Sequence, residues 1–445
     1  MSQIGRMTRR GVVLPALLVS ALGVSACGAG GSSTATPSAS SSQPTTVSSA
    51  PSSAASSAPS TVASNSPSNV AKTCGDVTPK APGGTADLSA LPAERAAAYD
   101  GYSAPVNTSV YANFPAKKGP FKIGYSDSFS ANPWRAQALA RLKKDVDTYK
   151  SAGLTVGLQA TNSNLDNNLQ IQQITSMINN KVDAIIAIPN SPTAFNGVIE
   201  QAYKAGIPFI TVSSHVTSPD AINVDGNNFL TGEEVAAAVA KVIGGKGEVL
   251  MVDGIHGSPT ASDMNNGVKA AFALCPNASV VGNLEGFWSD ASAKTVTLQY
   301  LATHPSLPAA VVNAGAMTNG IVQAFAQSGK TLPPMGDLNP TQGGVVTMLQ
   351  KLPDTSVAST VPPEEIMDGA FLTAIATLQG QGPKYDAIVG SVATVTGKTA
   401  LTAWIGPSWK STTTDGVPSV PSAPFLPQSG IGPFFTNPAT LPPLS

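Results

Sequence analysis

The side chains that most often carry out catalysis are few in this 445-residue chain, and they are not grouped. The three histidines, His215, His256 and His304, form neither an HExxH motif nor any other close pair of metal ligands. The chain also contains no GxSxG nucleophile motif and no GxxxxGK(S/T) phosphate-binding motif. We therefore expect no enzymatic activity, no catalytic metal and no other cofactor.

The charge balance argues against nucleic acid as a partner. Only 11% of the residues are charged, and the formal net charge is −1. A chain without a cluster of basic residues does not attract the phosphate backbone of nucleic acids. The glycine-rich segment 244–247 precedes a predicted strand and lacks the helix that a phosphate loop requires, so we interpret it as a tight turn.

The N-terminus carries the parts of an export signal. Arg6, Arg9 and Arg10 precede an apolar run over 11–24, and Cys27 follows a small-residue junction. The run is too short for a transmembrane helix. The segment 1–26 resembles bacterial lipoprotein signal peptides, in which the cysteine becomes the acylated first residue of the mature chain. This resemblance implies a lipid anchor at Cys27 on the extracytoplasmic face of the cell membrane; the alternative is an ordinary secretory signal with a chance cysteine.

A tether is predicted over residues 27–70. It consists almost entirely of Ser, Ala, Thr, Gly and Pro, without charged residues. Such a composition does not bury enough apolar surface to offset the entropy of ordering. We predict a flexible spacer between the lipid anchor and the folded part of the chain.

Cys74 and Cys275 are the two cysteines that remain after the anchor. In an oxidising extracytoplasmic setting two such cysteines commonly pair, and the alternative is a pair of buried free thiols. A disulfide would attach the segment before the core to the end of a predicted helix near Leu274.

Apolar runs alternate with helical patterns from residue 121 onward. In the first helical pattern Ala138, Leu142 and Val146 recur at a spacing of four. Short, fully apolar strands between helices are typical of a parallel sheet that helices cover on both faces. The predicted strands of this first series are 121–125, 154–159, 184–188 and 208–212, and the predicted helices are 134–149, 169–178 and 194–205.

A second series of the same kind begins after Asp225. The two series predict an α/β fold with two successive doubly wound parallel-sheet units, and a ligand crevice at the carboxyl ends of both sheets. The predicted strands of the second series are 248–252, 280–284 and 309–313, and the predicted helices are 229–243, 264–274, 292–303 and 317–328.

Several sequence marks along this core occur in a familiar order. They are Asn132-Pro133-Trp134-Arg135, the strand entry 181–186, the segment 205–212, the turn 244–249 and Ala302-Thr303-His304-Pro305. With these marks, residues 121 to about 409 resemble the type I periplasmic binding proteins of the ribose and other sugar-binding group, which serve ABC importers. Sugar-responsive repressors share the fold, but they carry a DNA-binding helix-turn-helix where this chain has its export signal and tether.

The resemblance implies two lobes that three crossovers join and that close around a ligand by a hinge motion. We expect the crossovers near 213–225, near 358–363 and after 380–384. The ligand-binding domain is then 119–410, with lobe 1 at about 119–223 and 360–381 and lobe 2 at about 224–359 and 382–410. The segment 71–118 is an N-terminal extension without an assigned role. The Pro-rich tail, 411–445, is expected to pack along the surface or to stay loose.

The same resemblance implies a set of ligand-binding residues. Asn132 would hydrogen-bond a ligand hydroxyl, and Trp134 would stack on the apolar face of the ligand unless it is a core residue of its helix. Arg135 occupies a place that is usually aromatic and would act as a donor fork. Asn228 matches the family's Asp-Asn pair at the start of the second lobe. Trp288 falls where the family places a second stacking aromatic side chain.

Other positions depart from the sugar-binding pattern. In the sugar-binding proteins an Asp-Arg pair hydrogen-bonds the ring hydroxyls of the ligand. At this place the chain has Ser213 and Ser214, followed by His215. Further on, Met264 replaces an arginine of the pattern. Where the sugar-binding proteins have an Asn-Asp pair, this chain has Ala314-Gly315. Of the expected polar side chains, only Asn313 and, further on, Asp337 remain near the ligand positions. His215 is either a pH-sensitive ligand contact or a solvated loop residue. A pocket with so few charges favours a ligand with fewer hydroxyls than a pentose or hexose, since each unpaired buried hydroxyl costs about 1 to 3 kcal/mol.

We therefore predict an extracytoplasmic, lipid-anchored solute-binding protein. It would act as a monomer, capture a small sugar or sugar-like molecule and deliver it to an ABC permease in the membrane. The alternative is a sensor that passes ligand occupancy to a membrane signalling receptor. A hydrolase would need a nucleophile and a base, and the sequence offers no such pair.

Overall fold

The computed structural model describes residues 73–78, 80–413, 416–418, 426 and 428–444. The predicted export signal, the Cys27 anchor and the tether lie outside these residues. No helix within the described ranges combines the length and the apolar character that spanning a membrane requires.

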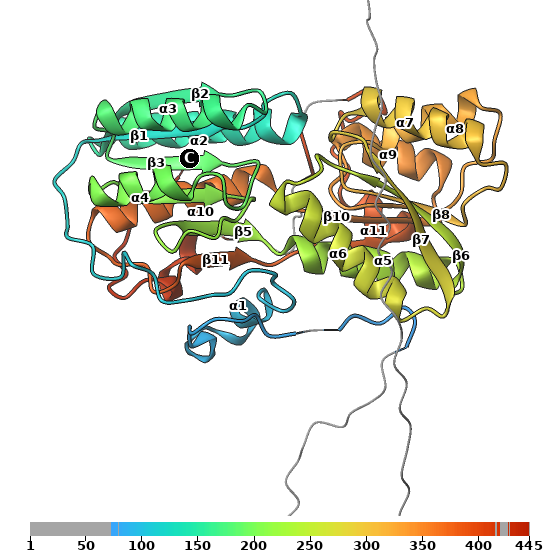
Figure 1. Cartoon of the computed structure of the whole chain (residues 1–445), viewed down its shortest axis with the longest axis horizontal. Helices are drawn as coiled ribbons and strands as arrows, with labels where there is room; N and C mark the ends of the chain where they lie inside the picture. Colours follow the sequence, from blue (N-terminus) through green and yellow to red (C-terminus); the bar gives the residue numbers. More distant parts are fainter. Residues whose placement is uncertain (1–72, 79, 414–415, 419–425, 427, 445) are drawn as a thin grey trace, which may run out of the picture. The chain divides into compact units, whose positions relative to one another are not determined.

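The first sheet is parallel throughout, with the strand order β11-β5-β4-β3-β1-β2 (Figure 1). Its strands are β1 (Phe121–Asp127), β2 (Thr155–Asn162), β3 (Ala184–Ile188), β4 (Phe209–Val212), β5 (Ile222–Gly226) and β11 (Ala387–Gly390). Its helices are α2 (Pro133–Ser151), α3 (Asn167–Asn179), α4 (Asn196–Lys204) and α10 (Pro363–Leu378). We call this sheet with its helices lobe 1.

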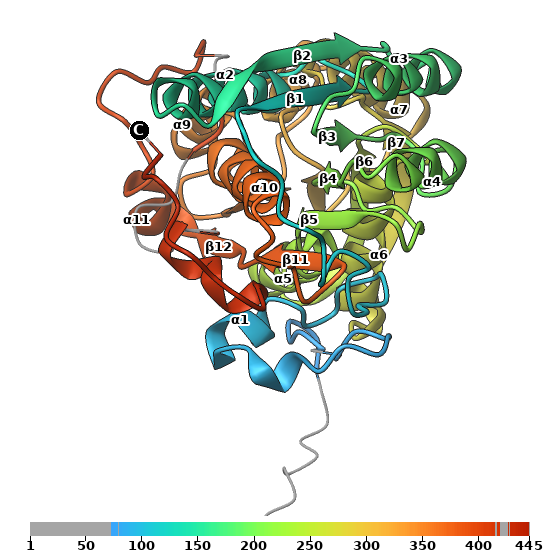
Figure 2. The same cartoon turned by 90° about the vertical axis from the view of Figure 1, so that its left-hand side faces the viewer.

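Both faces of the first sheet are covered, as the sequence predicted. Along β3, Ile186 and Ile188 join the apolar cluster of α2 and α10, whereas Ile185 and Ala187 join that of α3 and α4. Side chains alternate between the faces of a strand, so a strand buried on both faces is apolar at every position. Figure 2 shows the two pairs of helices on opposite sides of the strands.

The second sheet has the strand order β12-β10-β9-β8-β6-β7. Its strands are β6 (Lys246–Asp253), β7 (Asn277–Glu285), β8 (Ala310–Asn313), β9 (Met335–Asp337), β10 (Ser356–Thr360) and β12 (Ala393–Thr396). Its helices are α5 (Asn228–Val242), α6 (Pro259–Ala273), α7 (Asp290–Thr303), α8 (Thr318–Gln327), α9 (Gln342–Lys351) and α11 (Gly397–Thr402). We call this unit lobe 2. The sheet is parallel as predicted, except that the edge strand β12 runs antiparallel to β10.

Three crossovers join the lobes, and two lie further along the chain than the sequence predicted. The segment 222–226 forms strand β5 of lobe 1, so the first crossover lies at Gly226–Asn228 instead of within 213–225. The third lies between β11 and β12, after residue 390, because β11 still pairs with β5. The second, between β10 and α10, lies at the predicted position.

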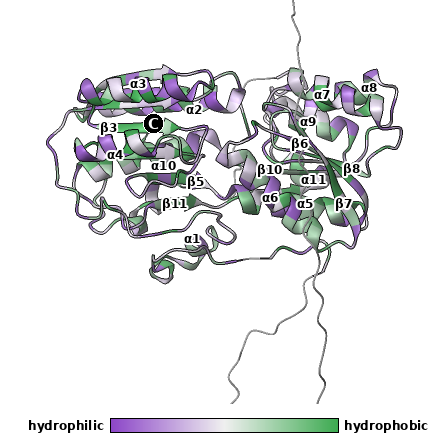
Figure 3. Ribbon diagram, viewed as in Figure 1, coloured by the Kyte–Doolittle hydropathy of each residue, from purple (hydrophilic) through white to green (hydrophobic). Residues whose placement is uncertain are grey.

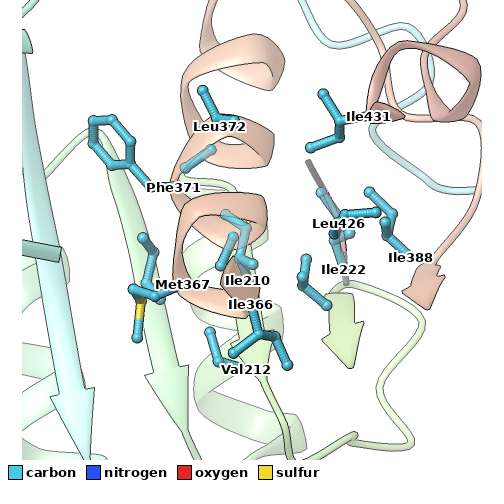
Figure 4. Packing of buried hydrophobic residues seen from close by; sticks show 14 of the residues in the cluster. Ile210, Val212, Ile222, Ile366, Met367, Phe371, Leu372, Ile388, Leu426 and Ile431 are labelled. Carbon is cyan, nitrogen blue, oxygen red and sulfur yellow. The ribbon is translucent and has the colours of Figure 1, made fainter. Parts of the chain in front are cut away.

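Helix α10 forms the centre of lobe 1 and is buried on nearly every face. Its Met367 and Phe371 lie on one side, while Leu426 and Ile431 of the C-terminal segment lie on the other (Figure 4). Strand β11 of the same sheet is coloured as hydrophobic in Figure 3. Such a helix has little amphipathic periodicity, since no face of it is free to be polar.

The N-terminal extension contacts both lobes. Cys74 forms a disulfide with Cys275, next to the end of α6 in lobe 2, and the Thr78 backbone N–H donates to Glu233 Oε1 of α5 at 2.8 Å. After the short helix α1 (Ala93–Ala97), Tyr99 and Tyr111 are fully buried in the core of lobe 1. The extension thus supplies core side chains to lobe 1 and a covalent link to lobe 2.

The C-terminal segment is also part of the core, in contrast to the predicted loose or surface tail. Phe434 and Phe435 are buried with Ile431 and Leu441 in the cluster around α10. Just before it, the backbone of Gly416 accepts a hydrogen bond from Gln342 of lobe 2, and the Val417 N–H donates to Gln137 Oε1 of lobe 1. Proline and serine surround these scattered apolar residues, so no periodic sequence pattern indicates their burial.

Candidate functional site

A cavity lies between the lobes, at the carboxyl ends of strands from both sheets. It contains about 510 Å³ of empty space, including the part open to solvent. Both sheets therefore contribute to one site, as expected for doubly wound folds. The lining residues are Asn132, Trp134, Arg135, Ile188, Ser213, Asn228, Thr260, Met264, Trp288, Ala314, Gly315, Ala316, Asn339 and Val361.

The start of α2 forms the lobe 1 wall. Asn132 caps the helix, because its Oδ1 accepts a hydrogen bond from the Arg135 backbone N–H at 2.9 Å, and Pro133 occupies the first helical turn. This use of Oδ1 leaves the amide Nδ2 as the group that Asn132 can offer to a ligand. Trp134 donates its Nε1–H to the carbonyl of Val361 at 2.7 Å, beside the second crossover.

Arg135 lines the cavity with its charge already balanced. Its Nη1 contacts the Asp127 carboxylate and donates to Ser128 Oγ at 3.2 Å. Asp127 is held in turn by the Tyr125 hydroxyl, which donates to it at 3.0 Å. Among the described residues that line the cavity, Arg135 is the one charged side chain, so the lining has no net charge once Asp127 is counted.

Trp288 forms the facing wall in lobe 2, after β7. Its Nε1–H donates to the Ala314 carbonyl at 3.0 Å, and its ring packs directly on Gly254, where an added Cβ would lie 2.2 Å from the ring. Only glycine fits beneath the indole. Trp134 and Trp288 are each 8% exposed, and both N–H groups are used within the protein, so each indole has only its ring to offer a ligand.

Three of the seven described non-glycine residues with a positive φ line this cavity. Ser213, Trp288 and Ala316 have φ values of 51°, 49° and 55°, in the left-handed region that side chains other than glycine rarely adopt. All three residues line the cavity. Such strain persists only where the surrounding structure imposes it, and it clusters at functional sites. The strain is an indication of a binding site that does not depend on any motif.

Asn228 begins α5 and is 2% exposed. Its Nδ2 donates to Asp225 Oδ1 at 3.3 Å, but its Oδ1 is buried without a hydrogen-bond partner. A buried acceptor without a partner is costly. Because Asn228 lines the cavity, the group that would satisfy this oxygen is a hydrogen-bond donor on a bound ligand.

Four of the residues proposed from the sequence do not line the cavity. Ser214 donates its hydroxyl to the Pro189 carbonyl at 2.6 Å, and His215 lies between two carboxylates. Asn313 accepts from the Gly315 backbone N–H at 3.0 Å, and Asp337 accepts from the Asn339 backbone N–H at 3.0 Å. Asn313 and Asp337 therefore support the loops that form the wall instead of reaching a ligand.

Asp337 is fully buried, and burial raises its pKa to about 7, although the Thr318 hydroxyl and the Asn339 N–H lower it. Within the described residues, no cluster of three His, Cys, Asp or Glu side chains could hold a metal ion. The polar groups at the cavity are amides, hydroxyls and one neutralised guanidinium, which suit hydrogen bonding to an uncharged ligand.

The sequence analysis did not assign several lining residues a role. They are Ile188, Thr260, Ala314, Gly315, Ala316, Asn339 and Val361. Thr260 lies beside the Ser258 cap of α6, and its hydroxyl donates to the Ser213 carbonyl of lobe 1. Asn339 follows a strand end, a position from which binding residues commonly project, and this was the signal available in the sequence.

Comparison with known proteins places residues 123–384 within the model of the periplasmic binding protein domain family. The xylitol-binding protein of Mycolicibacterium smegmatis is 26% identical over 205 residues, or 46% of this chain and 58% of that protein. The D-allose-binding periplasmic protein of Escherichia coli is 24% identical over 200 residues, or 43% of this chain and 64% of that protein. The chain thus spans less than two thirds of these two relatives.

Solved structures share the fold. An ABC transporter solute binding protein from Thermobispora bispora aligns with a TM-score of 0.59 and 26% identity, over 64% of this chain and 87% of that chain. A solute binding protein from Mycobacterium smegmatis with bound glycerol has a TM-score of 0.60 and 22% identity, over 66% and 99% of the two chains. These relatives are binding proteins, not enzymes.

Proposed function

Because the chain belongs to the periplasmic binding protein domain family, we propose that it captures a small, uncharged sugar or alditol in the cavity between its lobes. One observation carries the proposal. Two tryptophans from opposite lobes, each with its N–H already bonded, face one cavity together with amide side chains. Ring faces stack on C–H surfaces, while amides serve hydroxyls, and a small polyhydroxylated molecule presents both.

The names of the relatives support the same class of ligand. They include a xylitol-binding and an allose-binding protein, and a solved neighbour holds glycerol. In this chain the lining lacks the carboxylates that would grip several ring hydroxyls, and its guanidinium is balanced by Asp127. We therefore propose a neutral ligand in preference to a sugar acid or an amino sugar.

A thermal-shift screen tests this ligand class. Alditols, pentoses and hexoses would be compared with the corresponding sugar acids and amino sugars, on the full folded chain. A ligand that binds only the folded state raises its stability by about 2.7 kcal/mol at 100 times its dissociation constant. We expect a shift with at least one neutral compound and none with its charged analogue. A shift restricted to charged compounds would contradict the proposal.

We further propose that the protein is attached to the extracytoplasmic face of the membrane through Cys27 and delivers its ligand to an ABC permease. The basic residues, apolar run and small-residue junction before Cys27 support the anchor, and family membership supports the permease. Loss of ligand uptake on deletion of the gene is the expected result for a transport protein. Intact uptake with loss of a transcriptional response would favour the sensor alternative.

The anchor has a direct test. In the Cys27→Ser variant the acylated residue is absent, so the protein should be released as a soluble form or stay unprocessed. Fractionation and immunoblotting of membranes and medium measure this outcome. A processed variant that remains in the membrane fraction would refute the lipid anchor.

A further inference from the structure

His215 lies in a small buried cluster beside the first crossover. Its Nδ1 is 3.3 Å from Asp263 Oδ2 and 3.7 Å from Asp225 Oδ2. The three side chains are 12%, 9% and 1% exposed, respectively. A protonated histidine attracts the two buried carboxylates beside it. When the histidine loses its proton, the repulsion between the two carboxylates is no longer compensated.

The cluster connects the two lobes. His215 follows β4 and Asp225 belongs to β5, both in lobe 1, whereas Asp263 belongs to α6 in lobe 2. Thr260, one turn before Asp263, also joins these two segments, because its hydroxyl donates to the Ser213 carbonyl. Separation of the lobes would therefore remove Asp263 from His215.

The surrounding groups do not supply another positive charge. Tyr102 of the N-terminal extension donates its hydroxyl to Asp225 Oδ2 at 3.3 Å, and burial raises its pKa well above the usual range, so it stays neutral. Ser103 hydrogen-bonds Asp263. The titratable groups that face His215 are thus Asp225 from β5, Asp263 from α6 and Tyr102 from the extension.

The charge states follow from this geometry. Burial lowers the pKa of His215, but Asp225 and Asp263 outweigh that effect, and the net shift is upward. Burial raises the pKa of Asp263 to about 6, although His215 lowers it. When His215 is protonated and Asp263 is ionised, a cation therefore lies beside a carboxylate of the other lobe. Once His215 loses its proton, two buried carboxylates from different lobes face each other without compensation.

We propose that His215 is a proton-operated latch: its imidazolium holds Asp263 of lobe 2 against lobe 1, and its deprotonation favours separation of the lobes. This inference rests on the proposed capture of a ligand between the lobes and on the hinge motion that the family resemblance implies, and it adds a regulation of that motion. The closed arrangement places Asp263 beside His215 in addition to Asp225, so it binds the His215 proton more tightly than an arrangement in which Asp225 alone remains. Closure is accordingly favoured at neutral and mildly acidic pH and lost as the pH rises through the pKa of His215.

The test measures lobe separation without any ligand. Spin labels would be attached through Lys143→Cys on α2 and Gln299→Cys on α7, two exposed positions in different lobes. Double electron–electron resonance then gives the distance between them at pH 6.5 and pH 9. We expect one short distance at pH 6.5 and an additional longer population at pH 9. An unchanged distance distribution between the two pH values would overturn the latch.

Three variants assign the effect to the cluster. His215→Gln should give the same distribution at both pH values, and Asp263→Asn should show less of the long population at pH 9. His256→Gln is the matched control: His256 lies 3.8 Å from Asp253 within lobe 2, so the variant should keep the wild-type response. A wild-type response in both His215→Gln and Asp263→Asn, with folding verified by circular dichroism, would refute the proposal. Because no ligand is added, that result would leave the outcome of the ligand screen standing.

Discussion

Trp134 and Trp288 are held by the same device on opposite sides of the cavity. Each indole N–H donates to a backbone carbonyl, of Val361 and Ala314 respectively, and each ring is 8% exposed. The hydrogen bond fixes the plane of the ring, and Gly254 supports the indole of Trp288 from behind. The position of each ring is thus set before a ligand arrives, which lowers the entropy lost on binding.

This geometry gives a prediction for the two side chains. Trp134→Ala and Trp288→Ala should each weaken binding of the ligand identified by the screen at least tenfold, about 1.4 kcal/mol, because the stacking surface is lost. Trp288→Phe should retain more affinity than Trp288→Ala, since an aromatic face remains. Isothermal titration calorimetry measures both effects.

A third tryptophan provides the control. Trp404 is 5% exposed and packs in a separate cluster with Leu401 and Met348 of lobe 2, away from the cavity. Trp404→Ala should lower the melting temperature and leave the affinity of the folded protein unchanged. If the cavity variants behave like Trp404→Ala, with lower stability and unchanged affinity, Trp134 and Trp288 are core residues only.

At the level of elements, the C-terminal segment behaves as part of lobe 1. Leu426 lies so close to α10 that a Cβ added at Gly369 would be 2.6 Å from its side chain. Tyr149 at the end of α2 donates its hydroxyl to the Pro442 carbonyl at 2.7 Å. The segment therefore closes one face of the α2–α10 layer that would otherwise be apolar and exposed.

Removal of a ring from this segment should destabilise the protein. Phe434 is fully buried, so Phe434→Ala should lower the free energy of unfolding by about 3 to 5 kcal/mol through lost burial and a new cavity. Denaturant-induced unfolding measures the change. Leu307→Ala is the control, because Leu307 is 43% exposed and should matter little. Equal stability of the two variants would show that the segment does not pack on lobe 1 in solution.

At the scale of the whole molecule, buried carboxyl groups determine how stability responds to pH. Burial raises the pKa of Asp337 to about 7 and that of Asp263 to about 6, and it also raises the pKa values of Asp253 and Asp290. An unfolded Asp titrates near pH 4. Between that pH and the raised value, the folded state holds a proton that the unfolded state has lost, so stability falls as the pH rises.

The melting temperature should therefore be higher at pH 5 than at pH 8. Between the unfolded and the folded pKa of each such group, the free energy of unfolding falls by at most about 1.4 kcal/mol per pH unit. The Asp337→Asn variant lacks the carboxyl group that titrates differently in the folded and unfolded states between about pH 4 and pH 7. Its melting temperature should therefore fall less with rising pH than that of the wild type. Asp354→Asn changes an exposed carboxylate and serves as the control for loss of charge. A melting temperature that rises from pH 5 to pH 8 would contradict this account. Differential scanning calorimetry measures the profile.

Much of the fold is encoded in local sequence patterns. The alternation of short apolar runs and helical periodicity predicted the two α/β lobes, because a parallel strand covered on both faces must be apolar throughout, as β3 is. The start of α2 is also encoded locally, because Asn132 and Pro133 favour a helix N-terminus without the help of tertiary contacts. Hence the sequence by itself determined the fold class, whereas the resemblance to a known family brought Asn132, Trp134, Asn228 and Trp288 forward as candidates.

Tertiary structure decided what depends on contacts between distant segments. The ends of β8 and β9 carry Asn313 and Asp337, and a shift by one position turns a side chain from the cavity to the supporting layer. The pairing of β5 with β11, the burial of Phe434 and the place of His215 beside Asp263 likewise join residues far apart in the chain. No local pattern encodes these contacts, because they arise only when the two lobes and the terminal segments pack together.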